Sequence, residues 1–260
     1  MLSCESYGLD MSHDFISIVS SLSFIIVGII GLIRDFPINI KIIFALLFVN
    51  GFISAIWHYF INNLDWYKID ATFAMLSVLL LYIPLIEIFT EIYKEYFKEY
   101  YGIVISLSLI IGCIFFTIGF TNLYFNFMSF YSLNISFALT SIFLILFYFL
   151  LIIKYLDCFI QNRKVLIYCF IGIILILISQ IAQLGAIGFC NSQTKFIPLH
   201  SFWHLGLSFS TYYVCFFIIS LKNYQNDINF EINNSGFLNK IFPLIELIED
   251  EIHLEEEFLM

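Results

Sequence analysis

The feature that most constrains the fold is a series of long apolar runs. A helix needs roughly 20 residues to cross the hydrocarbon core of a bilayer, which is about 30 Å thick. Seven runs have about that length, at residues 15–33, 42–60, 71–90, 102–120, 132–153, 165–189 and 200–221. Strands of a membrane barrel would alternate apolar and polar residues, whereas residues 173–178 are apolar throughout. The sequence therefore predicts an all-α integral membrane protein with seven transmembrane helices.

The composition agrees with a membrane protein. Hydrophobic residues make up 61% of the chain and charged residues 12%, whereas soluble domains have roughly 25% charged residues. The first run follows the acidic residues Glu5, Asp10 and Asp14 rather than a basic segment, so we expect a retained helix and not a cleaved signal peptide. No basic cluster favours nucleic-acid binding, and no glycine-rich phosphate loop is present.

The distribution of Lys and Arg predicts the orientation of the chain. Basic residues in the short connections between helices stay on the cytoplasmic side of a membrane. With seven helices, the side that holds the N-terminus carries Lys68 and Lys195. The other side carries Arg34, Lys41, Lys94, Lys98, Lys154, Arg163, Lys164, Lys222 and Lys240. We therefore expect the N-terminus to be external or lumenal and the C-terminus to be cytoplasmic.

Polar residues with metal-binding chemistry gather at the predicted outer end. His58 lies near the end of the second run, Asp70 precedes the third, and His200 and His204 begin the seventh. His200 and His204 are one helical turn apart, and so are Ser54 and His58. Two imidazoles on one helix and a third from another make a three-nitrogen zinc site with an open position, the form that catalytic zinc takes. Zinc there can activate water and polarise a carbonyl, and Asp70 would accept the proton.

Simpler interpretations of these residues stay open. A single histidine near a membrane interface is more often hydrogen-bonded or turned to lipid headgroups, and two histidines four residues apart also occur by chance. Considered alone, Ser54 is most simply a small residue that packs between helices. For Gln180 and Gln183 we favour helix packing over the lining of a cavity. Interfacial anchoring is the usual role of tryptophans at this predicted edge, which are Trp57, Trp66 and Trp203.

Several polar residues follow one another in a distinctive order along the chain. They are Cys4-Glu5, Asp14, Ser54-x-x-x-His58, Asp70 and His200-Ser-Phe-Trp-His204. This order resembles the alkaline ceramidases and their bacterial relatives. Those enzymes belong to a wider group of seven-helix membrane hydrolases that includes the adiponectin receptors. The resemblance extends from residue 4 to about residue 221.

The resemblance implies a role for each matching residue. By position, the zinc ligands are His58, His200 and His204, the active-site serine is Ser54 and the aspartate is Asp70. In such enzymes zinc activates a water for attack on a lipid amide, the aspartate accepts its proton, and the serine stabilises the oxyanion. Amide hydrolysis needs both a nucleophile at neutral pH and stabilisation of the tetrahedral oxygen. The implied reaction cleaves ceramide-like N-acyl lipids to a fatty acid and a sphingoid-type amine, with an ester as the narrower alternative.

The resemblance also implies a calcium site near the N-terminus. Its carboxylates would be Glu5 and Asp14, whereas family members carry Asn at the positions of Ser17 and Ser21. Calcium prefers six to eight oxygen ligands, so backbone oxygens would have to complete the set. The alternative is a solvated N-terminal segment in which Asp14 sits favourably at the positive end of the first helix.

The six cysteines divide by predicted location. Three lie within helices and one on the cytoplasmic side, where thiols stay reduced: Cys113, Cys169, Cys215 and Cys158. Cys4 and Cys190 are external, and the eukaryotic relatives join these two segments by a disulfide. The resemblance therefore implies a Cys4–Cys190 bond. The alternative is two free thiols in loops too far apart to bond.

After residue 221 the long apolar runs end and acidic residues become frequent. We expect residues 1–221 to form the hydrolase domain and residues 222–260 an acidic, partly disordered cytoplasmic tail, with a short amphipathic helix as an option around residues 242–254. Two functional classes remain. The first is a zinc-dependent amidase acting on membrane lipid, and the second is a seven-helix receptor or lipid-binding protein with a structural zinc. Ser54 and Asp70 favour the amidase, because a structural zinc needs neither a proton acceptor nor an oxyanion donor.

Overall fold

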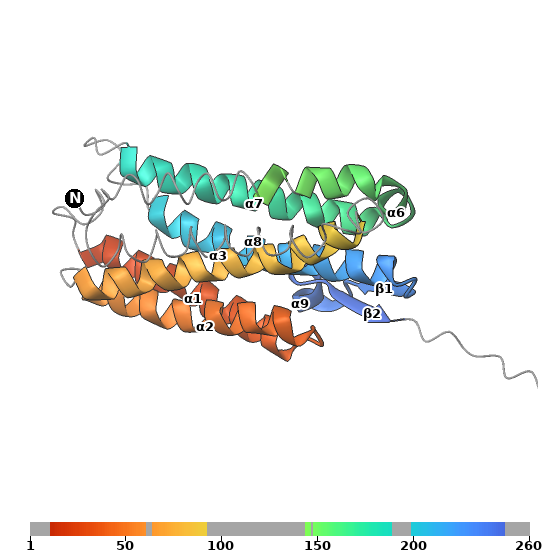
Figure 1. The fold of residues 1–260 in the computed structure, drawn as a ribbon. Coiled ribbons are helices and arrows are strands. Elements are labelled where there is room, and N and C mark those ends of the chain that lie inside the picture. Colours follow the sequence, from red (N-terminus) through yellow and green to blue (C-terminus); the bar gives the residue numbers. More distant parts are fainter. Residues whose placement is uncertain (1–10, 61–63, 93–143, 147, 189–198, 248–260) are drawn as a thin grey trace, which may run out of the picture.

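The structure, a computed structural model, is a bundle of long helices that run along a common axis (Figure 1). It describes residues 11–60, 64–92, 144–146, 148–188 and 199–247. The long helices are α1 (Met11–Ile33), α2 (Ile38–Tyr59), α3 (Leu64–Ile92), α7 (Arg163–Gly188) and α8 (Leu199–Gln225). The short helix α6 (Leu156–Gln161) precedes α7, and residues 144–146 and 148–154 are also helical. The chain then forms β1 (Phe230–Asn233), α9 (Gly236–Ile241) and β2 (Leu244–Leu247).

These helices confirm the helical fold class and indicate a membrane protein. Within the described ranges, α1, α2, α7 and α8 each contain a stretch that is long and apolar enough to cross a membrane. The predicted run at 71–90 lies inside α3. The run at 102–120 lies outside the described residues, and the run at 132–153 is described only in part. The count of seven spans and the orientation of the termini therefore stay predictions.

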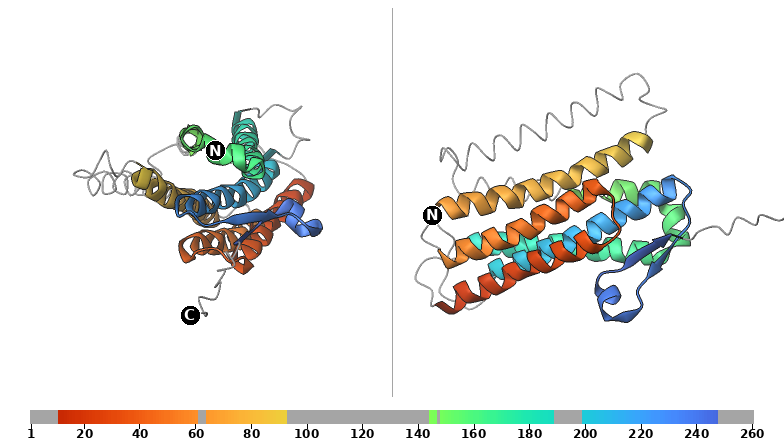
Figure 2. Two further views of the ribbon diagram at one scale, coloured as in Figure 1. Left: turned by 90° about the vertical axis from the view of Figure 1, so that its right-hand side faces the viewer. Right: turned by 90° about the horizontal axis from the view of Figure 1, so that it is seen from below.

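Helix α8 is the centre of the bundle. Of its membrane-length stretch, 89% is buried, compared with 44–50% for α1, α2 and α7. It contacts α1, α3 and α7, and α2 packs between α1 and α3, an arrangement visible in end view (Figure 2). By contrast, α1 exposes an apolar stripe at helical spacing that suits contact with lipid chains: Phe15, Val19, Leu22, Ile26, Ile29 and Ile33. Polar groups on α8 are thus shielded from the lipid.

Two glycines allow the helices to approach closely. A Cβ atom added at Gly28 of α1 would lie 2.8 Å from the Cα of Phe48 in α2. At Gly206 of α8 it would lie 2.8 Å from the Cβ of Ser179 and 3.0 Å from the carbonyl oxygen of Leu175, both in α7. Small residues at helix contacts are typical of membrane bundles. The second contact fixes α8 against α7 two residues from His204.

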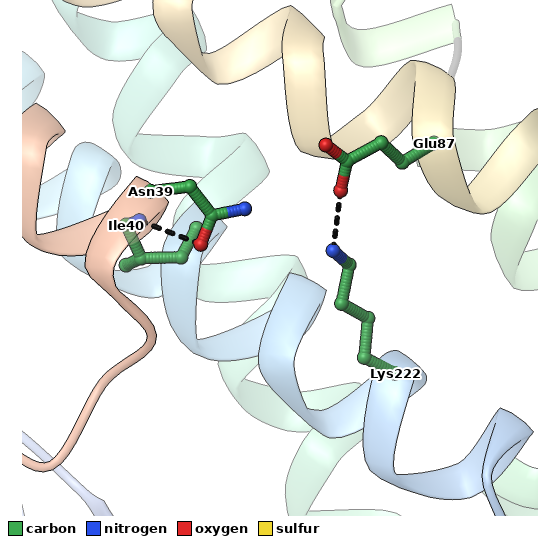
Figure 3. A network of polar contacts seen from close by, with 4 residues as sticks. All are labelled: Asn39, Ile40, Glu87 and Lys222. Carbon is green, nitrogen blue, oxygen red and sulfur yellow. Dashed lines mark hydrogen bonds and ion pairs between the residues drawn. The ribbon is translucent and has the colours of Figure 1, made fainter.

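We call the end where α2 finishes and α3 and α8 begin the histidine end, on the left in Figure 1. At the opposite end, α2 follows Pro37, and the Oδ1 of Asn39 accepts a hydrogen bond from the backbone N–H of Ile40 (3.0 Å; Figure 3). Near it, the Lys222 ammonium of α8 forms an ion pair with Glu87 of α3 (2.5 Å; Figure 3). This pair joins α3 to α8 at the end far from the histidines.

Residues 226–247 form a small folded unit in the part of the chain that we expected to be a partly disordered tail. Strands β1 and β2 pair antiparallel, and Phe230 lies opposite Leu247. Phe242 is 3% exposed, and its carbonyl accepts a hydrogen bond from Arg34, which follows α1 (2.9 Å). We call residues 226–247 the tail hairpin.

The optional helix at 242–254 is wrong for residues 244–247, which form the strand β2. The hairpin forms because hydrophobic side chains of the tail pack on α8, where Phe242 stacks on Phe209. The hydroxyl of Tyr213 also donates a hydrogen bond to the Ile241 carbonyl (2.6 Å). Residues beyond 247 lie outside the described part of the chain.

Candidate metal centre

Three histidines meet at the histidine end of the bundle. His58 is the second-last residue of α2, and His200 and His204 lie in the first two turns of α8. One potential ligand nitrogen from each ring lies within 4.8 Å of the other two. The three imidazole rings are 4.5–5.2 Å apart between centroids. The spacing of His200 and His204 therefore has the consequence predicted from the sequence: both face a third imidazole from another helix.

The chemistry of this cluster fits a metal ion. All three rings are buried, and Nε2 of His58 has no hydrogen-bond partner among the described residues. A buried polar nitrogen without a partner costs about 1–3 kcal/mol, and a metal bond would offset this cost. Three imidazoles suit zinc and several other divalent transition metals. The cluster can hold a metal ion, and its geometry does not distinguish zinc from those alternatives.

Ser54 links the histidine cluster to Asp70. Asn50, Ser54 and His58 succeed one another at four-residue spacing along α2, and all three are buried. The Ser54 hydroxyl oxygen lies 3.4 Å from Nε2 of His204, and it is also hydrogen-bonded to the Asp70 carboxyl of α3. Asp70 is 4% exposed and is not one of the three grouped ligands. Its carboxyl group is thus connected to His204 of the cluster through Ser54.

A row of serines on α1 forms the other wall of the centre. The Ser20 oxygen lies 2.8 Å from Nδ1 of His204, and the Ser21 oxygen lies 3.4 Å from the same nitrogen. Ser21 also donates to the Ser54 hydroxyl (3.2 Å). Deeper in the bundle, the Ser208 hydroxyl of α8 donates to that of Ser23 (2.9 Å). This face of α1 is hydrogen-bonded to the centre, and our sequence analysis assigned none of these serines to the zinc site.

Helix α7 supplies a partner for the second histidine of α8. Nδ1 of His200 lies 3.3 Å from Oε1 of Gln183. The hydrogen bond to a neighbouring helix agrees with our preferred interpretation of Gln183, but its partner is a candidate metal ligand. In the sequence, the only indication that Gln183 could have such a role is that its amide lies within an apolar run.

Two tryptophans enclose the histidines. Trp57 and Trp203 are 4% and 6% exposed, so the expectation that they are interfacial anchors is wrong for these two. The ring of Trp203 stacks on that of His200 with centroids 5.3 Å apart, and the ring of Trp57 lies 4.2 Å from that of His58. Both rings therefore belong to the buried surroundings of the imidazoles.

Comparison with family models, with curated proteins and with solved structures gave no match. The geometry of the centre, together with the order of its residues along the chain, is therefore the basis for the function proposed below.

The remaining predicted site residues cannot be placed by the structure. Glu5, Cys4 and Cys190 lie outside the described residues, as do the side chains of Asp14 and Trp66. The calcium site and the Cys4–Cys190 disulfide therefore stay predictions. Among the described residues, Cys169 and Cys215 are free, buried thiols, which agrees with their predicted location within helices.

Proposed function

We propose that the chain is a zinc-dependent intramembrane hydrolase that cleaves the amide bond of ceramide-like N-acyl lipids. The observation that carries this proposal is the hydroxyl of Ser54, which lies 3.4 Å from His204 Nε2 and is hydrogen-bonded to Asp70. A purely structural metal site needs neither group. An amide hydrolase needs both, because a proton must be accepted from water and a negative oxygen must be stabilised.

Each described residue has a chemical task in this reaction. Zinc, when bound by the three histidines, would activate water at neutral pH and polarise the amide carbonyl. Asp70 accepts the proton that the attacking water loses. Ser54 donates its hydroxyl hydrogen to the carbonyl oxygen as the negative charge develops there.

The products follow from the balance of the reaction. The water oxygen adds to the acyl carbon, and the carbon–nitrogen bond breaks. Asp70 returns its proton to the leaving nitrogen, so that a fatty acid and an amine are formed. A centre at the end of an apolar bundle suits this substrate class, because a two-chain lipid places its amide at the edge of the hydrocarbon layer.

Hydrolysis by the purified full-length chain tests the proposal. The substrates are ceramide, a phospholipid and an N-acyl ethanolamine, each with a labelled acyl chain. We expect release of labelled fatty acid from ceramide, and a fall of about 10²–10⁴-fold in Asp70→Asn with its zinc retained. Glu87→Gln is the matched control, because it removes an acid from the opposite end of the same helix.

The outcomes distinguish the alternatives. Stoichiometric zinc without turnover of any of the three lipids would favour a lipid-binding or receptor-like protein with a structural zinc. Release of fatty acid from the phospholipid alone would identify an esterase. Equal loss of activity in Asp70→Asn and Glu87→Gln would contradict the role of Asp70 as the proton acceptor.

A further inference from the structure

The orientation of the His204 ring is set by a serine of α1. The Ser20 oxygen lies 2.8 Å from Nδ1 of His204, and the Ser20 hydroxyl donates to the backbone carbonyl of Ser17 at 2.8 Å. A hydroxyl has one hydrogen. With this hydrogen on the Ser17 carbonyl, which can only accept, the Ser20 oxygen is left to accept from His204. The proton of the neutral imidazole is then on Nδ1.

Metal binding through the other ring nitrogen would need the same tautomer. Because Ser20 and Ser21 lie at Nδ1, Nε2 is the nitrogen that His204 can offer to a metal shared with His58 and His200. A metal requires an unprotonated nitrogen. The tautomer with a proton on Nδ1 leaves Nε2 with its lone pair, whereas the other tautomer would direct an N–H into the cluster.

His200 has a comparable arrangement. Its Nδ1 lies 3.3 Å from Oε1 of Gln183, and an amide oxygen can only accept. The two ligands of α8 are therefore hydrogen-bonded to opposite neighbours, α1 and α7, through neutral acceptors. Metal-bound histidines often have a carboxylate in this position, which raises the basicity of the ligand. Neutral acceptors leave more positive charge on the metal.

We infer that Ser20 is a positioning residue that fixes the Nδ1–H tautomer of His204 and thereby presents Nε2 to the metal. This inference deepens the proposed zinc hydrolase and rests on it for the identity of the metal. It also gives α1 a specific task, because the helix holds a ligand that belongs to α8. Loss of such a hydrogen bond lowers metal affinity by about 10–100-fold in characterised sites.

Zinc affinity of the purified full-length chain tests the inference without a substrate. Measured by competition with a chromogenic chelator, Ser20→Ala should bind zinc about 10–100-fold more weakly than wild type. Ser20→Thr keeps the hydroxyl and should restore most of the affinity. Ser220→Ala is the control, because Ser220 is also a buried serine, but its hydroxyl donates to the Phe216 carbonyl of its own helix, α8, far from the histidine end (2.9 Å). It should bind zinc like wild type.

The tautomer provides a second readout that needs no serine variant to fold. Nitrogen-15 NMR of the metal-free wild type, with the His204 signals assigned by their loss in His204→Gln, should show the proton on Nδ1. A proton on Nε2, wild-type affinity in Ser20→Ala, or an equal loss in Ser220→Ala would each overturn the inference. Because no lipid is hydrolysed in these measurements, an inactive protein that passes them refutes only the proposed function.

Discussion

The Ser54 hydroxyl oxygen lies 3.4 Å from Nε2 of His204, although the two residues are 150 positions apart in the chain. This contact brings a buried serine of α2 to a ring nitrogen of a candidate metal ligand in α8. Its bond to Asp70 adds a carboxylate from a third helix. The proposed chemistry depends on this meeting of three helices.

Ser54→Ala should reduce hydrolysis by about 10²–10³-fold, because it removes a donor to the developing oxyanion. Zinc content should not change, since Ser54 is not a ligand in the proposed centre. Initial rates and metal analysis of the same preparation test both expectations. Ser210→Ala is the control, because its hydroxyl is buried in α8 and donates to the Leu207 carbonyl of the same helix (2.9 Å). Loss of zinc in Ser54→Ala would count against an oxyanion role.

Gly206→Ala should destabilise the protein by about 1–3 kcal/mol, because the added methyl group meets the backbone of α7. The displacement of α8 should also weaken zinc binding through His204. Thermal unfolding in detergent and the chelator competition measure the two effects. In Gly185→Ala, the added atom meets only the end of the Leu199 side chain at 3.1 Å, so the change should be small. Similar stability of both variants would contradict the close packing of α7 and α8.

Removal of the Lys222–Glu87 ion pair should have little effect on stability. Its side chains are 29% and 43% exposed, and pairs in such surroundings contribute about 0.2–1 kcal/mol. A double-mutant cycle with Lys222→Met and Glu87→Gln should give a coupling energy in that range. Zinc affinity should stay at the wild-type value, because the pair lies at the end opposite the histidines. A change in zinc affinity would contradict this expectation, because it would mean that the ion pair affects the histidines at the other end of the bundle.

Phe242→Ala should open the tail hairpin while the helices stay folded. The phenyl ring is buried against Phe209 and Tyr212, and truncation of a buried phenylalanine costs about 3–5 kcal/mol. Limited proteolysis should then cleave within residues 226–247 much faster than in wild type. Phe237→Ala serves as the control because Phe237 is 81% exposed. Equal cleavage rates in the two variants would mean that the hairpin is not held by this contact.

The meeting of the three histidines could be predicted because two simple rules determine it. A four-residue spacing puts His200 and His204 on one helix face, and consecutive long runs alternate in direction, which brings His58 to the same end. Both rules use only the positions of residues along the chain. The structure confirms the cluster and its capacity for a metal, while seven spans and hydrolysis remain predictions.

The hydrogen-bond partners of the ligands could not be predicted from the sequence. A serine in an apolar run gives the same pattern whether it bonds its own backbone or an imidazole, and Ser20 does both. The choice depends on which face of α1 is turned to α8, and this is set by packing such as that at Gly28. Burial of the two tryptophans was missed for a similar reason.

The folded tail hairpin was missed because its fixing contacts are not local. Its strands are four residues long and contain acidic residues, so they show no strong periodicity. They are held by groups such as Arg34, which follows α1, and Tyr213, which lies in the middle of α8.

The zinc content of the purified full-length chain tests the central claim most directly. After dialysis against low concentrations of free zinc, elemental analysis of wild type should give about one zinc per chain. His58→Ala, His200→Ala and His204→Ala should each lose most of it, because each removes one of three ligands. Wild-type protein that is folded but binds no zinc, or zinc retained in full by all three variants, would contradict the account.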